Sequence, residues 1–368
     1  MEREAWQSEL QNCVRMVEEL ENYFPIENKD RMREVLANMR LSITPHTLKL
    51  IDFQNPNDPI LLMCVPQEKE LRFSPEELVD PIGDETKSPI PFLTHRYPDR
   101  VLIHATFFCS LFCRFCFRRT KTGEATPGPN GEDRDRIVDY LRSHPEVDEV
   151  ILTGGDPLTL LDSQLEDWFA RIRSVDSIHR IRIHTRVPVN LPSRITDAFI
   201  VLVQKYTDAT HPIYIITHFN HPNEIAPENI TAIAKLIDAG IVVRNQGPLL
   251  CGINDDPMIL EQLFKRLADI RVVPYYLHQL DLAKGTNHFR VPIHRGIEIM
   301  RALQGRVTGI ALPRFVLDLP EGKGKVPLIY SYIQKSGGAG SGSAGQTDSE
   351  YQIESPFGEV VNYCEPEC

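Results

Sequence analysis

The stretch CSLFCRFC, residues 109 to 116, decides how the rest of this chain is interpreted. It places three cysteines within eight residues, directly after an apolar run, Val101 to Ala105, that predicts a buried strand. Thiolates are ligands that iron–sulfur clusters and zinc both accept. Three of them can hold three corners of a four-iron cluster and leave the fourth iron open for chemistry. The alternatives are a zinc site completed by a distant His or Cys, and simple buried thiols.

The composition predicts an ordinary globular protein whose size suits one large α/β domain with appendages, or two domains. Its 368 residues are 25% charged and 42% hydrophobic, and the formal net charge of −11 argues against a nucleic-acid partner. We find no apolar run near the roughly 18 residues of a membrane span, and the charged N-terminus lacks a signal core. We therefore expect a cytoplasmic protein. In that compartment its eight cysteines are not a disulfide framework.

The first 92 residues predict a helical appendage and a long lead-in segment. Apolar stripes over residues 10–20 and 32–39 indicate two helices, with Asn28 at the start of the second and Pro45 as its stop. Residues 52–91 are rich in Pro, Asp and Asn, which favours a traversing segment over a core element.

From Val101 onward, stretches typical of strands and helices alternate, which predicts six β-α units around a parallel sheet. The expected strands are Val101–Ala105, Glu149–Leu152, Arg180–Ile183, Pro212–Ile216, Gly240–Arg244 and Val272–Leu277. The expected helices are Asp133–Leu141, Gln164–Val175, Asp197–Lys205, Glu228–Asp238, Met258–Leu267 and Gly296–Leu303. In such sheets the chemistry lies at the carboxyl ends of the strands.

The end of the chain predicts a last strand and an extension. We expect a strand over Gly309–Leu317, a flexible loop over the low-complexity run Gly337–Gly345, and a short strand pair within Tyr351–Tyr363. The chain then divides into residues 1–92, a central domain over 93–332, and a C-terminal extension over 333–368.

Two further turns carry candidate chemistry. Gly154-Gly155-Asp156 follows the second strand, where paired glycines allow close approach to the backbone and the Asp can accept from an ammonium. Alone it is ordinary turn chemistry, but together with the Cys-x3-Cys-x2-Cys spacing it resembles the S-adenosylmethionine (SAM) turn of the radical SAM enzymes. The second turn, Asp318–Pro327, places Lys325 on a glycine-containing loop, where a lysine can bind pyridoxal 5′-phosphate (PLP) covalently. A solvated loop with two surface lysines is the alternative.

Taken together, the chain closely resembles the lysine 2,3-aminomutase family, the PLP-dependent radical SAM aminomutases. Long and unusual segments carry the resemblance over roughly residues 5 to 366. They are Asn55–Pro59, Leu93–Val101, the cysteine stretch with Arg118 and Arg119, Thr217–Glu224, Asn245-Gln246, Pro274–Tyr276 with Gln279 and Asp281, His288–Arg290, and Asp318–Pro327. The resemblance implies a partial (β/α)6 radical SAM barrel with an N-terminal helical appendage and a C-terminal extension.

The resemblance also implies roles residue by residue. Cys109, Cys113 and Cys116 would hold a [4Fe–4S] cluster that binds SAM, with Gly154, Gly155, Asp156, His218 and Gln246 on the SAM side. Lys325 would hold PLP, and Arg96, Tyr97 and Arg100 would contact its phosphate. Arg118 would bind the substrate carboxylate, and Asp281 and Asp318 would bind its distal ammonium.

The implied activity is that of an isomerase that moves the α-amino group of an L-amino acid, L-lysine first, to the β-carbon to give β-lysine. Arginine, glutamate and a lysine isomerase linked to translation-factor modification are the alternatives, and a non-catalytic metal-binding protein is a remote one. The expected partners are the amino acid, a flavodoxin- or ferredoxin-like electron donor and a second copy of the chain, as a dimer or tetramer.

The sequence departs from the family at a few positions. Asp256 stands where some members have a zinc-ligating Cys, so we expect no intersubunit zinc here. His278 stands where the lysine enzymes have a Tyr, Phe117 replaces a smaller residue, and Gly337–Gly345 has no counterpart.

Overall fold

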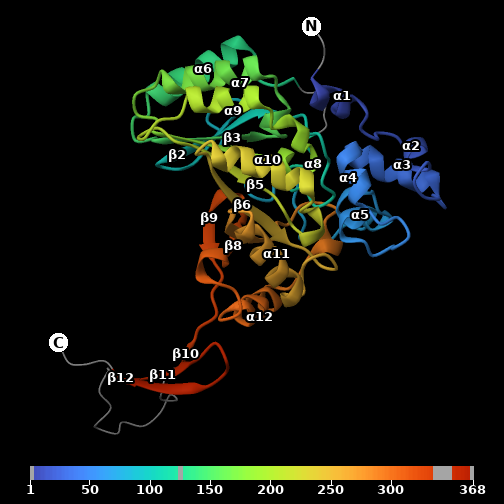
Figure 1. The fold of residues 1–368 in the computed structure, drawn as a ribbon, viewed down its shortest axis with the longest axis vertical. Helices are drawn as coiled ribbons and strands as arrows, with labels where there is room; N and C mark the ends of the chain where they lie inside the picture. Colours follow the sequence, from blue (N-terminus) through green and yellow to red (C-terminus); the bar gives the residue numbers. More distant parts are fainter. Residues whose placement is uncertain (1–3, 123–126, 335–349, 365–368) are drawn as a thin grey trace.

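The computed structural model of the protein describes residues 4–122, 127–334 and 350–364, and it is built around a nine-stranded sheet (Figure 1). The strands lie in chain order, β1 to β9, across the sheet. They are β1 (Leu93–Tyr97), β2 (Arg100–Thr106), β3 (Glu149–Gly154), β4 (Arg180–His184), β5 (Ile213–Thr217), β6 (Val242–Leu249), β7 (Val273–Gln279), β8 (Arg314–Leu319) and β9 (Gly324–Pro327).

Strands β2 to β8 pair in parallel, and the two edge strands β1 and β9 pair antiparallel to their neighbours. The six predicted β-α units are thus confirmed, and they bring the carboxyl ends of β2 to β7 to one edge of the sheet. The antiparallel edges were not predicted.

Seven helices follow the strands of the sheet: α6 (Gly131–Arg142), α7 (Asp162–Arg173), α8 (Val187–Asn190), α9 (Asp197–Lys205), α10 (Pro227–Asp238), α11 (Pro257–Asp269) and α12 (Ile293–Leu303). Helix α7 shows why they pack on the sheet. Its Leu165, Trp168, Phe169 and Ile172, which follow the i, i+3, i+4, i+7 pattern of one helix face, are all fully buried. The Asp256 side chain caps α11 by accepting from the backbone N–H of Met258, so this residue has a structural use.

The two edge strands of the sheet approach one another, which closes it into a partial barrel. The backbone N–H of Lys325 in β9 donates to the Tyr97 hydroxyl in β1 over 2.9 Å. The first and last strands therefore meet beside the lysine that the sequence singles out.

The N-terminal region packs against both the barrel and the cysteine loop. It contains α1 (Ala5–Gln11), α2 (Val17–Leu20), α3 (Lys29–Asn38), α4 (Pro45–Leu50) and α5 (Pro59–Cys64), drawn in blue in Figure 1. Together with Leu111 and Phe115 of the cysteine loop, Ile43, Ile60 and Met63 of this region form a second apolar core.

Three expectations for this region were wrong. The first apolar stripe is split into α1 and α2, because Val14 between them pairs with Ile43 as an isolated β-bridge. Pro45 does not end α3 but begins α4, where its missing N–H costs no helical hydrogen bond. Within residues 52–91, α5 is a core element, since Met63 is fully buried. The Asn28 cap of α3 is confirmed, as its side chain accepts from Arg31 N–H.

The C-terminal extension carries a separate three-stranded sheet that projects away from the barrel (Figure 1). Strands β11 (Glu350–Glu354) and β12 (Val360–Cys364) form the predicted pair, and β10 (Ile333–Gln334) joins them. The predicted last strand begins later than expected, at Arg314, because Gly309–Ala311 forms a 3-10 turn. Gly337–Gly345 lies outside the described residues. None of the helices that the structure describes has the length and apolarity that crossing a membrane requires.

Candidate active site

A cavity of about 700 Å³ opens inside the barrel, and every site residue predicted from the sequence lines it. The predicted residues are Cys109, Cys113, Cys116, Arg96, Tyr97, Arg100, Gly154, Gly155, Asp156, His218, Gln246, Arg118, Asp281, Asp318 and Lys325. The structure thus gathers side chains that lie more than 200 positions apart in the chain. Their individual roles stay predictions.

The cysteine loop leaves the end of β2 and places its three thiols on the wall of the cavity. Burial raises the pKa of Cys109, and the nearby Asp156, Cys116 and Cys113 raise it further, so the three thiols lie within reach of one another. Among the described residues no three His, Cys, Asp or Glu side chains converge on a point where one metal ion could sit. A four-iron cluster binds each thiolate to a different iron, so its ligands need no such convergence. Three thiolates on one loop therefore fit the ligand set of a four-iron cluster.

A buried ion-pair network fixes this loop from behind. The Glu70 carboxylate accepts from Arg114 Nε at 2.9 Å and Nη2 at 2.6 Å, and it also accepts from Arg119. Arg114 lies between two of the cysteines, and its guanidinium is fully buried. Because Arg119 also donates to the Gly285 carbonyl, the network joins the N-terminal region, the cysteine loop and the segment after β7.

The glycine turn after β3 packs against the start of the cysteine loop. A Cβ on Gly154 would lie 2.2 Å from the Thr106 carbonyl oxygen, and one on Gly155 would lie 2.2 Å from that of Phe108. The close approach that the paired glycines allow is therefore to the protein's own backbone. The Asp156 carboxylate is likewise engaged by protein groups, Thr185 Oγ1 at 2.6 Å and Arg186 N–H at 2.7 Å.

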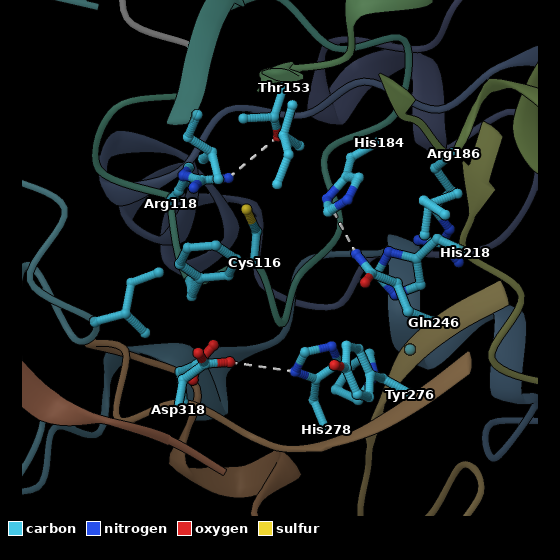
Figure 2. A pocket seen from close by; sticks show the side chains of 18 of the residues that line it. Cys116, Arg118, Thr153, His184, Arg186, His218, Gln246, Tyr276, His278 and Asp318 are labelled. Atoms are coloured by element: carbon cyan, nitrogen blue, oxygen red, sulfur yellow. Dashed lines mark hydrogen bonds and ion pairs between the residues drawn. The ribbon is translucent and has the colours of Figure 1, made fainter. Parts of the chain in front are cut away.

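Arg118 extends into the cavity two residues after the last cysteine of the loop (Figure 2). Its Nε and Nη2 both lie 2.9 Å from Oδ2 of Asp84, and its Nη1 lies 3.4 Å from Thr153 Oγ1. Asp84 belongs to the lead-in segment, and its Oδ1 also pairs with Arg96 Nη2 at 3.2 Å. One buried carboxylate therefore holds two of the three predicted ligand arginines.

Lys325 enters the cavity from β9 and meets two polar partners. Its Nζ lies 2.6 Å from Oδ2 of Asp318 and 3.2 Å from Nδ1 of His278. Burial alone would raise the pKa of Asp318, but the contacts with His278 and Lys325 outweigh it and hold that pKa well below its usual range. Asp318 is thus an ionised acid that is paired with a cation when no ligand is bound.

The pKa of Asp281 shifts in the opposite direction to that of Asp318. Burial and the neighbouring charge of Asp318 raise its pKa to about 7, and its Oδ1 has no hydrogen-bond partner. A buried carboxylate without a partner is costly, and a cation in the cavity would satisfy it.

On the opposite wall, Gln246 Nε2 contacts His184 Nδ1 at 3.3 Å, next to His218 and Arg186 (Figure 2). No described residue forms a hydrogen bond with the buried Nε2 atoms of His184 and His218. Arg186 donates to Cys113 Sγ at 2.7 Å and pairs with the buried Glu224 at 2.5 Å. These groups could contact a polar ligand beside the cysteine loop.

Two predicted phosphate contacts are partly engaged in the structure. The Arg100 guanidinium stacks over the Tyr97 ring at 3.8 Å and donates to Asp99. Arg96 bonds the Ile82 carbonyl and Asp84, while its buried Nε has no partner.

Several cavity residues were not singled out from the sequence as site residues. Arg186 lies just after the end of β4 and Thr153 lies near the end of β3, so strand-end position was the signal that could have identified them. Asp84 had no such signal, because it lies in an irregular segment.

The chain is similar in sequence to several known proteins. The model of the radical SAM superfamily matches residues 103–264. The L-lysine 2,3-aminomutase of Clostridium subterminale is 42% identical over 330 residues, covering 89% of this chain and 78% of that protein. The L-lysine 2,3-aminomutase of Methanococcus maripaludis is 41% identical over 333 residues, covering 89% and 76%. The glutamate 2,3-aminomutase of Clostridioides difficile is 39% identical over 334 residues, covering 90% and 78%.

Proposed function

The chain belongs to the lysine 2,3-aminomutase family of radical SAM enzymes, and on that premise we propose that it converts L-lysine to β-lysine. It is an isomerase of the radical SAM aminomutase class, and the family uses a [4Fe–4S] cluster, SAM and PLP. Family membership does not decide the amino acid, because the similar glutamate enzyme matches over the same share of the chain.

The observation that carries the lysine assignment is the unpartnered oxygen of Asp281 beside Asp318. Two carboxylates at one end of a cavity favour a ligand whose far end is a cation. A glutamate side chain would bring a third negative charge to this end, which is unfavourable. Arginine also has a distal cation, but its planar guanidinium is larger and has five N–H donors that need acceptors, against three for an ammonium.

The donor sets in the cavity suit the three cofactors. When bound, the cluster and SAM supply the radical that removes hydrogen from the amino acid, and PLP carries the migrating amino group. Cys109, Cys113 and Cys116 would hold the cluster, and Lys325 would hold PLP. Tyr97 and Arg100 lie on the same cavity wall as Lys325, where they would meet the PLP phosphate.

The protein's own contribution is to hold the substrate at both ends. Arg118 would bind the α-carboxylate, and Asp281 with Asp318 would bind the distal ammonium. Two anchors fix the β-carbon between them, and a fixed near-attack geometry is the larger part of what an enzyme adds when cofactors perform the bond chemistry. The apolar side chains of Leu111, Phe112 and Phe115 line the cysteine side and exclude water there.

Three further expectations belong to the same proposal. The cluster requires a one-electron donor, for which a flavodoxin- or ferredoxin-like protein is proposed, and the chain is proposed to act as a homo-oligomer. A cytoplasmic location suits the cysteines whose sulfurs the structure describes, all of which are unpaired.

The deciding experiment is anaerobic turnover with SAM and a reductant, offering lysine, arginine and glutamate separately and analysing the products by chiral chromatography. β-Lysine as the main product supports the proposal. A different β-amino acid as the main product contradicts the substrate assignment and leaves the reaction class intact. Asp281→Asn should lower kcat/KM for lysine by at least about tenfold, since it removes one of the two charges at the distal end.

A further inference from the structure

Asp84 belongs to a chain of alternating charges along the lining of the cavity. The order is Arg118, Asp84, Arg96, Asp318, Lys325, with the Arg96 Nη1 to Asp318 Oδ1 distance at 3.5 Å. The Asp84 side chain is 5% exposed. Burial opposes its ionisation, but the guanidinium charges of Arg118 and Arg96 hold the pKa of Asp84 below its usual range. Asp84 therefore presents a fixed negative charge to the two arginines.

The segment that carries Asp84, residues 80–88, is itself rigidly held, and we call it the strap. The Asp80 carboxylate accepts from the backbone N–H groups of Asp84 at 2.9 Å and Glu85 at 2.8 Å. Gly83 has φ +69°, and a Cβ on it would lie 2.4 Å from the Gly322 backbone nitrogen, so the strap packs directly on the turn before β9. The Lys87 carbonyl accepts from the His95 N–H at 2.8 Å, which ties the strap to β1.

The way in which Asp84 grips Arg118 leaves part of the guanidinium free. Asp84 takes the Nε and Nη2 edge of the fork, and Thr153 lies 3.4 Å from Nη1. A planar guanidinium held along one edge can turn little, so its remaining N–H groups point in a fixed direction into the cavity.

We propose that Asp84 is a positioning residue for the substrate carboxylate: it orients Arg118 so that the free side of the guanidinium meets the α-carboxylate of the amino acid. The inference rests on the proposed function, which assigns that carboxylate to Arg118. In Asp84→Asn, an NH2 group replaces one carboxylate oxygen. The side chain then has a single acceptor oxygen and can accept from only one of the two arginines, Arg96 or Arg118. Arg96 keeps Asp318 as a partner, and Arg118 is the side chain that loses its fixed direction.

The test measures binding without turnover. The holoenzyme with cluster and PLP, lacking SAM and reductant, is titrated with L-lysine and with L-lysinamide, which differs only in the carboxylate. The visible absorption of PLP reports when the ligand amine replaces Lys325. The readout is the dissociation constant of lysinamide divided by that of lysine. A general loss of stability would weaken the binding of both ligands and leave this ratio unchanged.

We expect wild-type protein to prefer lysine, and Asp84→Asn to reduce that preference by about tenfold to a hundredfold, as a misplaced positioning group does. Arg118→Met gives the limit of complete loss. Glu85→Gln is the matched control, because Glu85 is the next acid in the strap, is 63% exposed and pairs only with Lys121 among the described side chains. Its preference should equal that of the wild type.

Asp84→Glu keeps the charge and moves the carboxylate oxygens by one methylene, so it should also lose preference for lysine over lysinamide. If the Asp84→Asn protein does not bind PLP, the Asp84→Glu protein supplies the test instead. If the wild type prefers lysine and these variants keep or increase that preference, the inference about Asp84 is wrong, while the proposed function stands. Absence of any preference for lysine in the wild type overturns the carboxylate assignment of the proposed function and the inference with it.

Discussion

The amino group of Lys325 lies 2.6 Å from Oδ2 of Asp318, so the lysine expected to hold PLP is paired with an acid expected to hold the substrate. The same oxygen lies 3.4 Å from Nδ1 of His278. The Lys325 amino group therefore lies beside a carboxylate that is expected to bind the substrate's distal ammonium.

Lys325→Ala should abolish covalent retention of PLP and reduce amino-group migration to background, because no other lysine of the described residues lines the cavity. Borohydride reduction followed by peptide mass spectrometry checks the attachment site. Lys323→Ala is the control, since Lys323 lies two residues away, is 64% exposed and pairs with Glu321. Migration at the wild-type rate in Lys325→Ala, without added amine, would contradict the assignment.

The binding of lysine should depend on pH through Asp281. Its pKa is raised to about 7, so below pH 7 the carboxyl is protonated and neutral, and it cannot attract an ammonium. As pH rises through 7 the carboxylate forms and affinity increases. We expect the dissociation constant of lysine to fall by about tenfold between pH 6 and pH 8. Titration of the holoenzyme over this range measures it, and Asp281→Asn should remove this component and bind more weakly at pH 8.

Glu70→Gln should destabilise the protein strongly. The change removes the charge that neutralises Arg114 and Arg119, both of which are buried. Breaking a buried ion pair by removing one partner costs about 3–5 kcal/mol, which is measurable as a reduced free energy of unfolding in urea. Glu18→Gln, which breaks a pair that is 53% exposed on both sides, should leave the unfolding curve unchanged. Equal curves for Glu70→Gln and the wild type would show that the network carries no stability.

Gly155→Ala should weaken the cysteine loop. The added Cβ would lie 2.2 Å from the Phe108 carbonyl oxygen, so the start of the loop must move, at a cost of about 1–3 kcal/mol. The iron content per chain after anaerobic reconstitution should fall below that of the wild type. Gly131→Ala is the control, because a Cβ there meets no atom within 4 Å. Full iron loading of Gly155→Ala would contradict the close-packing argument.

The central sheet was predictable because each buried strand is a short apolar run followed by an amphipathic helix. The prediction was weakest where polar residues continue a strand. Strand β6 extends to Leu249, beyond the expected Arg244, since Asn245 is buried by bonding both the N–H and the carbonyl of Phe219. Strands β1 and β9 were missed because LTHRY and GKVP carry no apolar alternation.

The residues of the candidate site also fall into those that the sequence could identify and those that it could not. Cys109, Cys113, Cys116 and Lys325 lie in local motifs, so spacing and neighbours identify them. Asp84 acts through Arg118, which is 34 positions away, and no local pattern encodes that contact. The placement of a loop acid depends on tertiary packing, here on Gly83 against Gly322. The division of the chain at residues 93 and 333 and the separate role of each site residue stay predictions.

The bond between the Lys325 amide and the Tyr97 hydroxyl joins positions 228 residues apart. A nascent chain has no such partner until the ninth strand leaves the ribosome, and a product truncated before that strand lacks the lysine altogether. Capture of the vitamin B6 cofactor should therefore come late in maturation, after both ends of the sheet have met. PLP that is trapped on Lys325 by borohydride during translation or refolding would then report that the two edge strands of the sheet have met. Far-ultraviolet circular dichroism does not reveal this step, because it reports mainly the helices that form earlier.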